Sequence, residues 1–594
     1  NVIENLSAGQ LMQGEPDASS FPHGGSRSTF EARGYTTWDL TSPLFVMQGT
    51  NGKTLCIPTA FISYHGDALD LKTPLLRSEQ KLSESAVRFL RACGDEEVQR
   101  VKSTCGPEQE YFLVDKDFYF SRPDLVMTGR TLIGRSSAKN QQLSDQYFGD
   151  IPERVLSMMQ ELDLELHRLG IPAKTRHNEV APGQFEIAPI YQESNLAADS
   201  NQILMATIRR TARKHNFEAL LHEKPFIGVN GSGKHLNWSL GTDTGENLLH
   251  PGEHPSRNIR FLSIVACVLE ALHRHADVIR MSIASAGNDH RLGANEAPPS
   301  IMSAFVGERI KEIIDAIIAG RTMESADAKT MDPGARQLAS LARDDTDRNR
   351  TSPFAFTGNR FEFRACGSNA AIGFPLAVVN AAVAEVLDES ADLVAADVAA
   401  GMSTEDAIKK LTKKWLVSSE KILFNGDGYS QEWVEEAESR GLPNMRNTPA
   451  ALPVLKDVKA TAFLRNTGVL TARELETRYN VAVEVYCTKR EIEFRTLNSL
   501  VYRYVMPAVV AYKNQILAVV QGQQSANLES VAELALLEEL DVHQRAALER
   551  NKLLEKGLDD LPDDLQERSE LIGSTLLGHA DAIADACNQL ELLV

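Results

Sequence analysis

The stretch Cys105-Gly-Pro-Glu-Gln-Glu-Tyr-Phe-Leu-Val114 decides which fold the chain is expected to adopt, because it alternates like a β-strand. Successive side chains of a strand point to opposite faces, so Glu108 and Glu110 are predicted to share one face, about 7 Å apart. Two like charges held this close repel one another, and burying them is costly unless a cation lies between them.

Two later segments show the same alternation. In Lys234-His-Leu-Asn-Trp-Ser-Leu240 the apolar residues fall on one face of a predicted strand. The polar residues His235, Asn237 and Ser239 fall on the other. In Arg360-Phe-Glu-Phe-Arg364 the charged residues face away from the two phenylalanines. Both segments are therefore predicted to present polar groups in the same way as the acidic pair.

A hairpin is predicted around Glu179 and Glu186, which stand an odd number of residues apart. The turn at Ala181-Pro-Gly183 allows both carboxylates to reach one side. One acidic pair is more often a solvated face, but four such segments backed by apolar residues favour a site for two cations. The candidate ligands are Glu108, Glu110, Glu179, Glu186, His235 and Glu362.

The ligand types indicate which cations would bind. Oxygen donors with a single imidazole and no thiolate suit Mg²⁺ or Mn²⁺ better than structural zinc. Phosphoryl transfer from ATP requires hard divalent cations in such a carboxylate shell, because they bridge phosphate oxygens. The sequence therefore predicts a two-cation site that binds a nucleotide.

The composition excludes several classes of protein. With 62 basic and 81 acidic residues and a formal net charge of −19, the chain is too acidic for a nucleic-acid partner. The seven cysteines are scattered without a Cys-x-x-Cys pair, so neither a disulfide framework nor a zinc knuckle is predicted. No apolar run approaches the roughly twenty residues of a membrane span. We therefore expect a cytoplasmic enzyme that binds neither nucleic acid nor membrane.

The pattern along the chain predicts an α+β protein of three parts. Residues 1–98 alternate short apolar runs with turn residues, which is typical of a small β-rich domain ending in a helix. Residues 99–400 alternate acidic strands with amphipathic helices and form the predicted catalytic domain. Residues 401–594 have helical spacing throughout, and 530–556 with 566–593 are predicted to form an antiparallel helical hairpin.

The segment Gly228-Val-Asn-Gly-Ser-Gly-Lys234 almost matches a phosphate-binding P-loop. The hydroxyl residue that should ligate Mg²⁺ is replaced by His235, and the following residues alternate like a strand, whereas a P-loop must open a helix. We therefore favour another role, in which Asn230 and Gly231 contact a small polar substrate and His235 ligates a metal.

Two further polar segments have more than one interpretation. The Gly-, Asn- and Pro-rich stretch 285–299 is equally compatible with a functional loop and with an ordinary connector. Arginines recur after it, as Arg348, Arg350, Arg360 and Arg364. They could form a solvated face, but beside a carboxylate-metal site they are better interpreted as clamps for phosphate and for a substrate carboxylate.

Five motifs of this chain, taken in order, resemble those of glutamine synthetase, and specifically its long type III branch. Each motif alone would be weak, but five in the family's order are highly specific. The resemblance covers roughly residues 14–380 by motif, and the helical remainder by type III organisation only. The motifs are Gly106–Glu110, His177–Glu186, Asn230–His235, Arg291–Pro298 and Arg360–Arg364.

This resemblance implies a fold of an N-terminal β-grasp domain, a catalytic domain of antiparallel strands flanked by helices, and a helical C-terminal extension. Because the chain begins at Asn1 and type III relatives carry more sequence before this point, the β-grasp domain is expected to be incomplete. The implied reaction is ATP-dependent ligation of ammonia to the side-chain carboxylate of L-glutamate. It passes through γ-glutamyl phosphate and yields L-glutamine, ADP and phosphate.

The resemblance also implies cofactors and an assembly. Two or more Mg²⁺ or Mn²⁺ ions would bind at each site. The protein would be a homo-oligomer of stacked rings, expected to be a dodecamer, with active sites shared between adjacent subunits.

Individual residues receive roles from the same resemblance. Glu110, Glu179 and Glu186 would hold one cation, and Glu108, His235 and Glu362 the other. The residues expected to bind glutamate are Asn230, Gly231, Arg291 and Arg364. Those expected to bind ATP are Asn237, Ser239, Arg348 and Arg360.

The remaining roles concern catalysis and ammonium. Asp17-Ala-Ser-Ser20 resembles a loop that a neighbouring subunit contributes, in which Asp17 takes a proton from ammonium and Ser20 lies near substrate. Glu296 would belong to the flap that closes over the reaction, and Arg348 would act on the phosphates. Tyr147 is the candidate tyrosine of the ammonium site.

The chain departs from the family pattern at a few places. Asn237 stands where many relatives have a second histidine near ATP, Ala18 replaces a glycine, and the flap is one residue shorter than in the short bacterial type. No metal ligand is affected. The tyrosine motif that is adenylylated in the short form is not evident, so that regulation is not expected.

Two alternatives remain open at this stage. A ligase of the same fold could couple glutamate to a larger amine, which would require an open apolar amine pocket in place of Asp17, Tyr147 and Glu296. A non-catalytic relative would be expected to have lost metal ligands, whereas all six are present.

Overall fold

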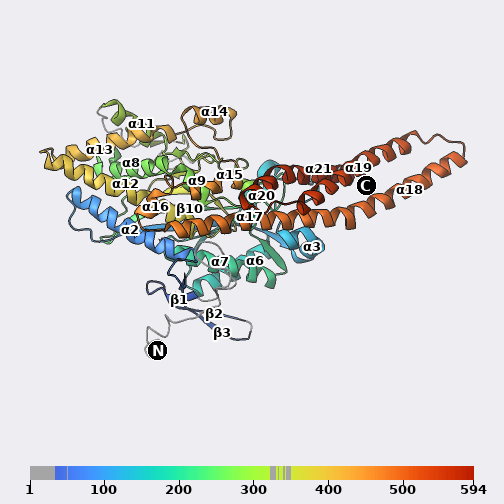
Figure 1. Cartoon of the computed structure of the whole chain (residues 1–594), viewed down its shortest axis with the longest axis horizontal. Coiled ribbons are helices and arrows are strands. Elements are labelled where there is room, and N and C mark those ends of the chain that lie inside the picture. Colours follow the sequence, from blue (N-terminus) through green and yellow to red (C-terminus); the bar gives the residue numbers. More distant parts are fainter. Residues whose placement is uncertain (1–33, 50, 322–329, 332, 339–340, 343–348) are drawn as a thin grey trace.

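A sheet through the middle of the molecule carries the predicted acidic strands (Figure 1). The computed structural model describes residues 34–49, 51–321, 330–331, 333–338, 341–342 and 349–594. Within these residues the sheet has nine strands. Their order is β11 (Ala304–Phe305), β14 (Phe354–Phe356), β15 (Phe361–Gly367), β10 (Gly233–Thr242), β5 (Val101–Asp115), β7 (Gln184–Pro189) and β6 (Ala173–Asn178), with β8 (Gln192–Glu193) and β9 (Phe217–Leu220) also paired to β5. Every pair is antiparallel except β11 with β14, so the predicted α+β class is confirmed.

The central strand β5 has two different faces. Cys105, Gln109 and Tyr111 are fully buried and project to the back of the sheet. Glu108 and Glu110 project to the front, as the alternation predicted.

Helices cover the back of the sheet. Trp238 on β10 donates its Nε1–H to Asn380 Oδ1 at 2.9 Å, and Asn380 donates to Ser103 Oγ on β5 at 3.1 Å. Strand and helix are thus joined by buried polar contacts as well as by apolar packing. The covering helices are α2 (Lys72–Ala92), α7 (Ser194–Lys214), α8 (Ile259–Arg274) and α12 (Gly373–Ala399). With the back filled in this way, the front face is left for the polar side chains.

Shorter elements fill the rest of the catalytic part. Between them, the described residues of β12 (Thr330–Met331) and β13 (Leu341–Ala342) pair as a small ribbon. The helices are α3 (Lys116–Ser121), α4 (Pro123–Thr128), α5 (Asp145–Phe148), α6 (Glu153–Arg168), α9 (Ala276–Ser282), α10 (Asn288–Arg291) and α11 (Glu308–Ala319).

The described N-terminal strands form two small antiparallel ribbons before α2. One ribbon pairs β1 (Gly34–Trp38) with β4 (Thr59–Ser63), and the other pairs β2 (Phe45–Gln48) with β3 (Lys53–Cys56). The predicted Asp17 and Ser20 lie outside the described residues. The β-grasp assignment and the division at residues 98 and 400 therefore stay predictions.

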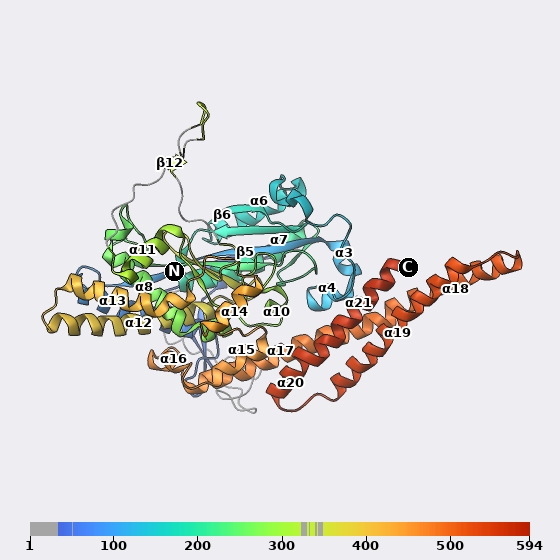
Figure 2. The same ribbon diagram turned by 90° about the horizontal axis from the view of Figure 1, so that it is seen from above.

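The C-terminal part is helical, as predicted, and a long arm projects from the body (Figure 2). Its helices are α13 (Thr404–Ser419), α14 (Gln431–Ser439), α15 (Thr448–Ala451), α16 (Ala462–Asn466), α17 (Ala472–Leu500), α18 (Met506–Ser525), α19 (Val531–Asp559), α20 (Leu565–Leu571) and α21 (Leu577–Leu593). The expected pairing of 530–556 with 566–593 is present as α19 against α21, while α18 also packs on α19. Among the described residues no helix combines the length and the apolar character needed to cross a membrane.

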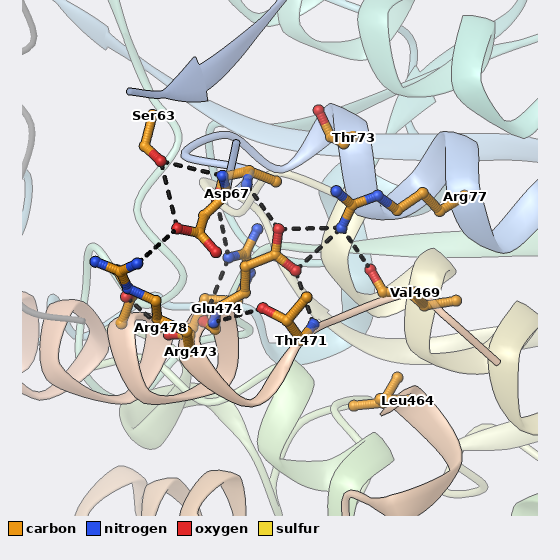
Figure 3. A network of polar contacts seen from close by, with 12 residues as sticks. Ser63, Asp67, Thr73, Arg77, Leu464, Val469, Thr471, Arg473, Glu474 and Arg478 are labelled. Atoms are coloured by element: carbon orange, nitrogen blue, oxygen red, sulfur yellow. Dashed lines mark hydrogen bonds and ion pairs between the residues drawn. The ribbon is translucent and has the colours of Figure 1, made fainter. Parts of the chain in front are cut away.

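The first turn of α17 is tied to the N-terminal part of the chain by the buried carboxylate of Glu474 (Figure 3). It accepts hydrogen bonds from the backbone N–H groups of Ala68 at 2.6 Å and Thr471 at 2.8 Å. Arg77 Nη1 on α2 lies 3.0 Å from both carboxylate oxygens. The Thr471 hydroxyl accepts from the Glu474 N–H, which completes a capping box. Burial alone would raise the pKa of Glu474, but these contacts outweigh it and lower the pKa.

Replacing Glu474 by alanine should lower the free energy of unfolding by about 2–3 kcal/mol, because Arg77 and two backbone donors would lose their buried partner. Urea unfolding followed by far-UV circular dichroism measures this. The matched control is Glu476→Ala, an exposed glutamate in the same turn, which should change stability by less than about 0.5 kcal/mol. Equal losses in the two variants would contradict the role of Glu474.

The contribution of Glu474 should also depend on pH. Its folded-state pKa lies below the usual value of about 4.3, so the carboxylate stabilises the fold above that pH, and this stability is lost as the pH falls through the folded-state pKa. The stability gap between the natural protein and Glu474→Gln should therefore be present near about pH 7 and shrink below about pH 4. A gap of constant size over this range would rule the linkage out.

Candidate active site

Strand register brings most of the predicted ligands to the front of the sheet. Residues directly opposite each other in antiparallel strands share a face. The opposite pairs are Glu110 with Glu186, Glu108 with His235, and Glu362 with Asn237. Because Glu108 and Glu110 share the front face of β5, all of these side chains belong to one surface.

The predicted hairpin between β6 and β7 is present. The N–H of Glu179 donates to Gln184 O at 2.9 Å, and the N–H of Gln184 donates to Ala181 O at 3.0 Å. This tight return brings Glu179 to the same side as Glu186, although an odd number of residues separates them.

The first group of candidate ligands joins three strands, β5, β10 and β15. His235 Nδ1 lies 3.1 Å from Glu108 Oε2 and 3.0 Å from Glu362 Oε1. One donor atom from each of these residues lies within 4.8 Å of the others, as expected for a shared cation. Burial alone would lower the pKa of His235, but the two carboxylates outweigh it and raise the pKa to about 10.

The second group contains a residue that the sequence analysis did not single out. His177, Glu179 and Glu186 have donor atoms within 4.8 Å of one another, and His177 Nε2 lies 2.9 Å from Glu186 Oε1. Glu110 is not part of this close group, since its Oε2 accepts a hydrogen bond from the Gly233 N–H at 2.7 Å. The signal that could have found His177 is its place opposite Glu186 in the hairpin.

These two groups fit hard divalent cations. Burial, together with the charges of Glu110 and Glu186, raises the pKa of Glu179 to about 9. A divalent cation that binds this carboxyl group would displace the proton that the group otherwise keeps. The donor set of carboxylate oxygens with imidazole nitrogens is compatible with Mg²⁺ or Mn²⁺.

A cavity of about 770 Å³ opens beside Glu108 and contains the described residues predicted for ATP. Asn237, Ser239 and Arg360 line it, and Arg360 Nε donates to Asn237 Oδ1 at 2.7 Å. Arg348 lies outside the described residues. Lining residues that sequence reasoning missed include Lys174, Tyr191, Asn247 and Asn359.

Two of the residues predicted for glutamate are buried arginines at the front of the sheet. Arg291 Nη2 donates to Arg364 O at 3.2 Å, and Arg364 Nη1 donates to Asn349 O at 2.9 Å. The buried Nε of Arg364 has no hydrogen-bond acceptor among the described residues. A Cβ at Gly233 would lie 2.0 Å from Arg291 Nη2, so only glycine leaves room for this guanidinium.

The predicted Asn230 and Gly231 lie in the loop just before β10. Asn230 exchanges two hydrogen bonds of 3.0 Å with the side chain of Gln141, one through its own amide and one through its backbone N–H. Gly231 O accepts from Gln184 Nε2 at 2.8 Å. A Cβ at Gly231 would lie 2.4 Å from Glu223 O, so the close approach of these backbones requires glycine.

The predicted flap lies next to the second ligand group. Glu296 has a positive φ of 70°, unusual for a residue with a side chain, and pairs with Arg350. The charge of Glu296 contributes to the raised pKa of Glu179. Tyr147 lies edge-on to His177, with 6.4 Å between ring centroids, so both predicted residues meet at this group.

The C-terminal part also reaches the front of the site. Asn349 Nδ2 donates to Gly426 O at 2.8 Å, and the Gly428 N–H donates to Thr351 Oγ1 at 2.8 Å. Burial raises the pKa of the neighbouring Tyr429 to about 12, although the charge of Arg364 acts in the opposite direction. Sequence reasoning missed this segment because it lies far along the chain from every motif.

Comparisons with known proteins show which sequences and structures this chain is similar to. Family models described as the glutamine synthetase type III N terminal, the glutamine synthetase catalytic domain and the glutamine synthetase C-terminal domain match residues 1–78, 85–301 and 407–524. The solved glutamine synthetase of Plasmodium falciparum aligns with a TM-score of 0.46 and 16% identity, covering 65% of this chain and 68% of that one.

Two curated relatives match most of the chain. It is 45% identical over 603 residues to the glutamine synthetase of Bacteroides fragilis, covering 100% of this chain and 82% of that protein. It is 47% identical over 531 residues to the type-3 glutamine synthetase of Dictyostelium discoideum, covering 88% of this chain and 72% of that protein. At this identity and coverage, and with the predicted ligands gathered on one sheet face, the chain belongs to the type III glutamine synthetase family.

Proposed function

We propose that this protein ligates ammonia to the side-chain carboxylate of L-glutamate, using ATP, and so makes L-glutamine. The observation that carries the proposal is the meeting, at one sheet face, of two carboxylate–histidine groups that could hold cations, a cavity of about 770 Å³ and two buried arginines. That arrangement stands in a chain whose relatives are named glutamine synthetase.

The reaction has two steps. A side-chain oxygen of glutamate attacks the γ-phosphorus of ATP, and the new O–P bond forms as the bond to the β-phosphate oxygen breaks and ADP leaves. Ammonia then attacks the carbonyl carbon of γ-glutamyl phosphate, and the C–O bond to phosphate breaks as the nitrogen gives one proton to the leaving phosphate. The proton that ammonium must lose goes to the carboxylate of Asp17.

Two sets of side chains would hold the cations, which would be Mg²⁺ or Mn²⁺. When bound, such ions neutralise charge on the phosphate oxygens. The first set is Glu108, His235 and Glu362, and the second is Glu110, Glu179 and Glu186, to which the structure adds His177 as a further donor.

The substrates are oriented by the remaining polar groups. Asn237, Ser239 and Arg360 line the cavity assigned to ATP, and Arg348 is assigned to its phosphates. Arg291 and Arg364 are assigned to glutamate with Asn230 and Gly231. Support for Arg364 comes from its buried Nε, which lacks an acceptor among the described residues and suits a carboxylate.

Flap closure protects the acyl phosphate from water. Glu296, held by Arg350, lies beside the group that contains Glu179, and Tyr147 lies near His177 of the same group. Excluding water here favours attack by ammonia over hydrolysis.

The proposal extends to assembly and location. We propose a cytoplasmic homo-oligomer of stacked rings, a dodecamer, in which Asp17 and Ser20 reach the site of an adjacent subunit. The chain would divide into the remainder of a β-grasp domain at 1–98, a catalytic domain at 99–400 and a helical region at 401–594.

The direct test is an assay of ADP and glutamine formation from glutamate, ammonium and ATP, with Mg²⁺ and Mn²⁺ tried separately. Turnover should require all three substrates and one of the cations. A parallel series with polyamines in place of ammonium separates this activity from ligation of a larger amine. Turnover that prefers a polyamine, or none at all, would overturn the proposed function.

Replacing Glu362 by alanine should leave the fold intact but lower glutamate-dependent ADP release by about 100-fold or more, because one cation loses a ligand. Circular dichroism checks the fold, and the assay above checks the activity. The control is Glu253→Ala, which removes an exposed glutamate. Undiminished turnover in Glu362→Ala would contradict the assignment of Glu362 as a metal ligand.

For Asp17→Ala we expect impaired glutamine synthesis, most severe at low ammonium, because the proton acceptor is lost. Mixed oligomers of Asp17→Ala and Glu362→Ala subunits should regain part of the activity if each site uses residues from two subunits. Oligomers of either variant alone are the controls. Mixed oligomers as inactive as both controls would count against shared sites.

A further inference from the structure

The short helix α10 (labelled in Figure 2) carries Arg291. Side-chain contacts from several parts of the chain hold it. With four residues it has too few hydrogen bonds to be stable alone, so its position depends on these contacts. Asn288 Nδ2 donates to Ala365 O on β15 at 2.9 Å. Asp289 accepts from the N–H and the hydroxyl of Thr448 at 3.0 and 2.8 Å. The next residue, His290, faces α17.

The contact between α10 and α17 is made by Arg490, whose side chain is 1% exposed. Arg490 Nη1 lies 2.5 Å from His290 Nε2, and Nη2 donates to Ala286 O at 3.1 Å. A guanidinium can only donate, so His290 Nε2 must accept and the imidazole must be neutral. Burial and the nearby Arg130 lower the pKa of His290 to about 4, in agreement with this.

Glu493, one turn further along α17, balances the charge of Arg490. It accepts from Arg490 Nη1 at 3.0 Å and lies 3.6 Å from Arg130 Nε. Burial would raise the pKa of Glu493, but the charges of Arg130 and Arg490 outweigh it and hold the pKa far below its usual range. The α17 side of this contact is therefore a buried ion pair, with a second arginine beside it, rather than a loose surface contact.

Arg291 depends on α10 for its own orientation. Within the described part of the chain its guanidinium makes only long hydrogen bonds, at 3.5 Å to Asn288 Oδ1, 3.3 Å to Cys366 O and 3.2 Å to Arg364 O. Hydrogen bonds of this length restrain a side chain weakly compared with those near about 2.9 Å. The direction in which Arg291 presents its donors is thus determined mainly by where α10 lies.

We propose that Arg490 is a positioning residue for the glutamate subsite, which acts through His290 and α10 to orient Arg291. The inference rests on the proposed function, since it takes Arg291 as a glutamate-binding residue. It gives the helical C-terminal part an indirect role in substrate binding, because α17 holds the helix that carries Arg291.

The chain offers a matched control on the same helix. Arg478 of α17 is also largely enclosed, but it donates to Asp70 O at 2.6 Å and Ala68 O at 3.4 Å, at the end of the helix that docks on the N-terminal part. Its remaining hydrogen bond within the described residues goes to Glu474 O on α17 itself, and none goes to α10. Arg478→Met should therefore weaken the docking of α17 without moving Arg291.

The experiment compares steady-state kinetics of Arg490→Met, Arg490→Lys and Arg478→Met in the full-length enzyme. Arg490→Met should raise the KM for glutamate by about fivefold or more and leave the KM for ATP unchanged. Arg490→Lys, which keeps the charge but cannot make both contacts, should fall in between. Arg478→Met should keep the KM for glutamate of the natural enzyme.

An unchanged KM for glutamate in Arg490→Met, an equal rise in Arg478→Met or an equal rise in the KM for ATP would overturn the inference. If Arg490→Met does not fold, Arg490→Lys and His290→Leu, which breaks the same contact from α10, give the same comparison with the same deciding outcomes. A natural enzyme without glutamate-dependent ADP release would overturn the proposed function and this inference with it. An active natural enzyme with no effect of these variants would overturn the inference alone.

Discussion

Repulsion between carboxylates on one sheet face is the constraint around which this structure is built. Four glutamates lie in two groups on or next to that face, each group with one histidine, and Glu110 projects from the same face. At least one of these carboxyls would hold a proton until a cation takes its place. The carboxylates stay close together only if the backbone that carries them is rigid, because flexible segments would move the charges apart. The support is β5 with its neighbours, whose back is filled by α12 and the helices around it.

Positively charged arginines lie on the same face as the carboxylates, and they require negatively charged partners. Arg291 and Arg364 are buried beside the acids, yet neither is fully satisfied by strong hydrogen bonds within the described chain. A substrate with its own carboxylates and phosphates would find matching donors and cations already in place. The glycines at 231 and 233 make this possible, since any side chain there would collide with the backbone or with Arg291.

The sequence predicted the parts of the site that follow local rules. Alternation along β5, β10 and β15 and the turn at Ala181–Gly183 were sufficient to place the acids together. His177, Tyr191 and the segment around Gly428 were missed, because their roles come from strand register and packing between distant parts of the chain. Arg490 was missed for the same reason: one arginine on a long helix carries no local signal of what it contacts.

The continuity of α17 limits how this chain can vary. Its first turn is anchored through Glu474, and further along Arg490 must face His290. Each residue of an α-helix turns the chain by about 100°, so one inserted or deleted residue between these points would rotate Arg490 away from α10. Substitutions at the surface positions of this stretch leave that geometry in place, whereas a change in its length reaches the active site.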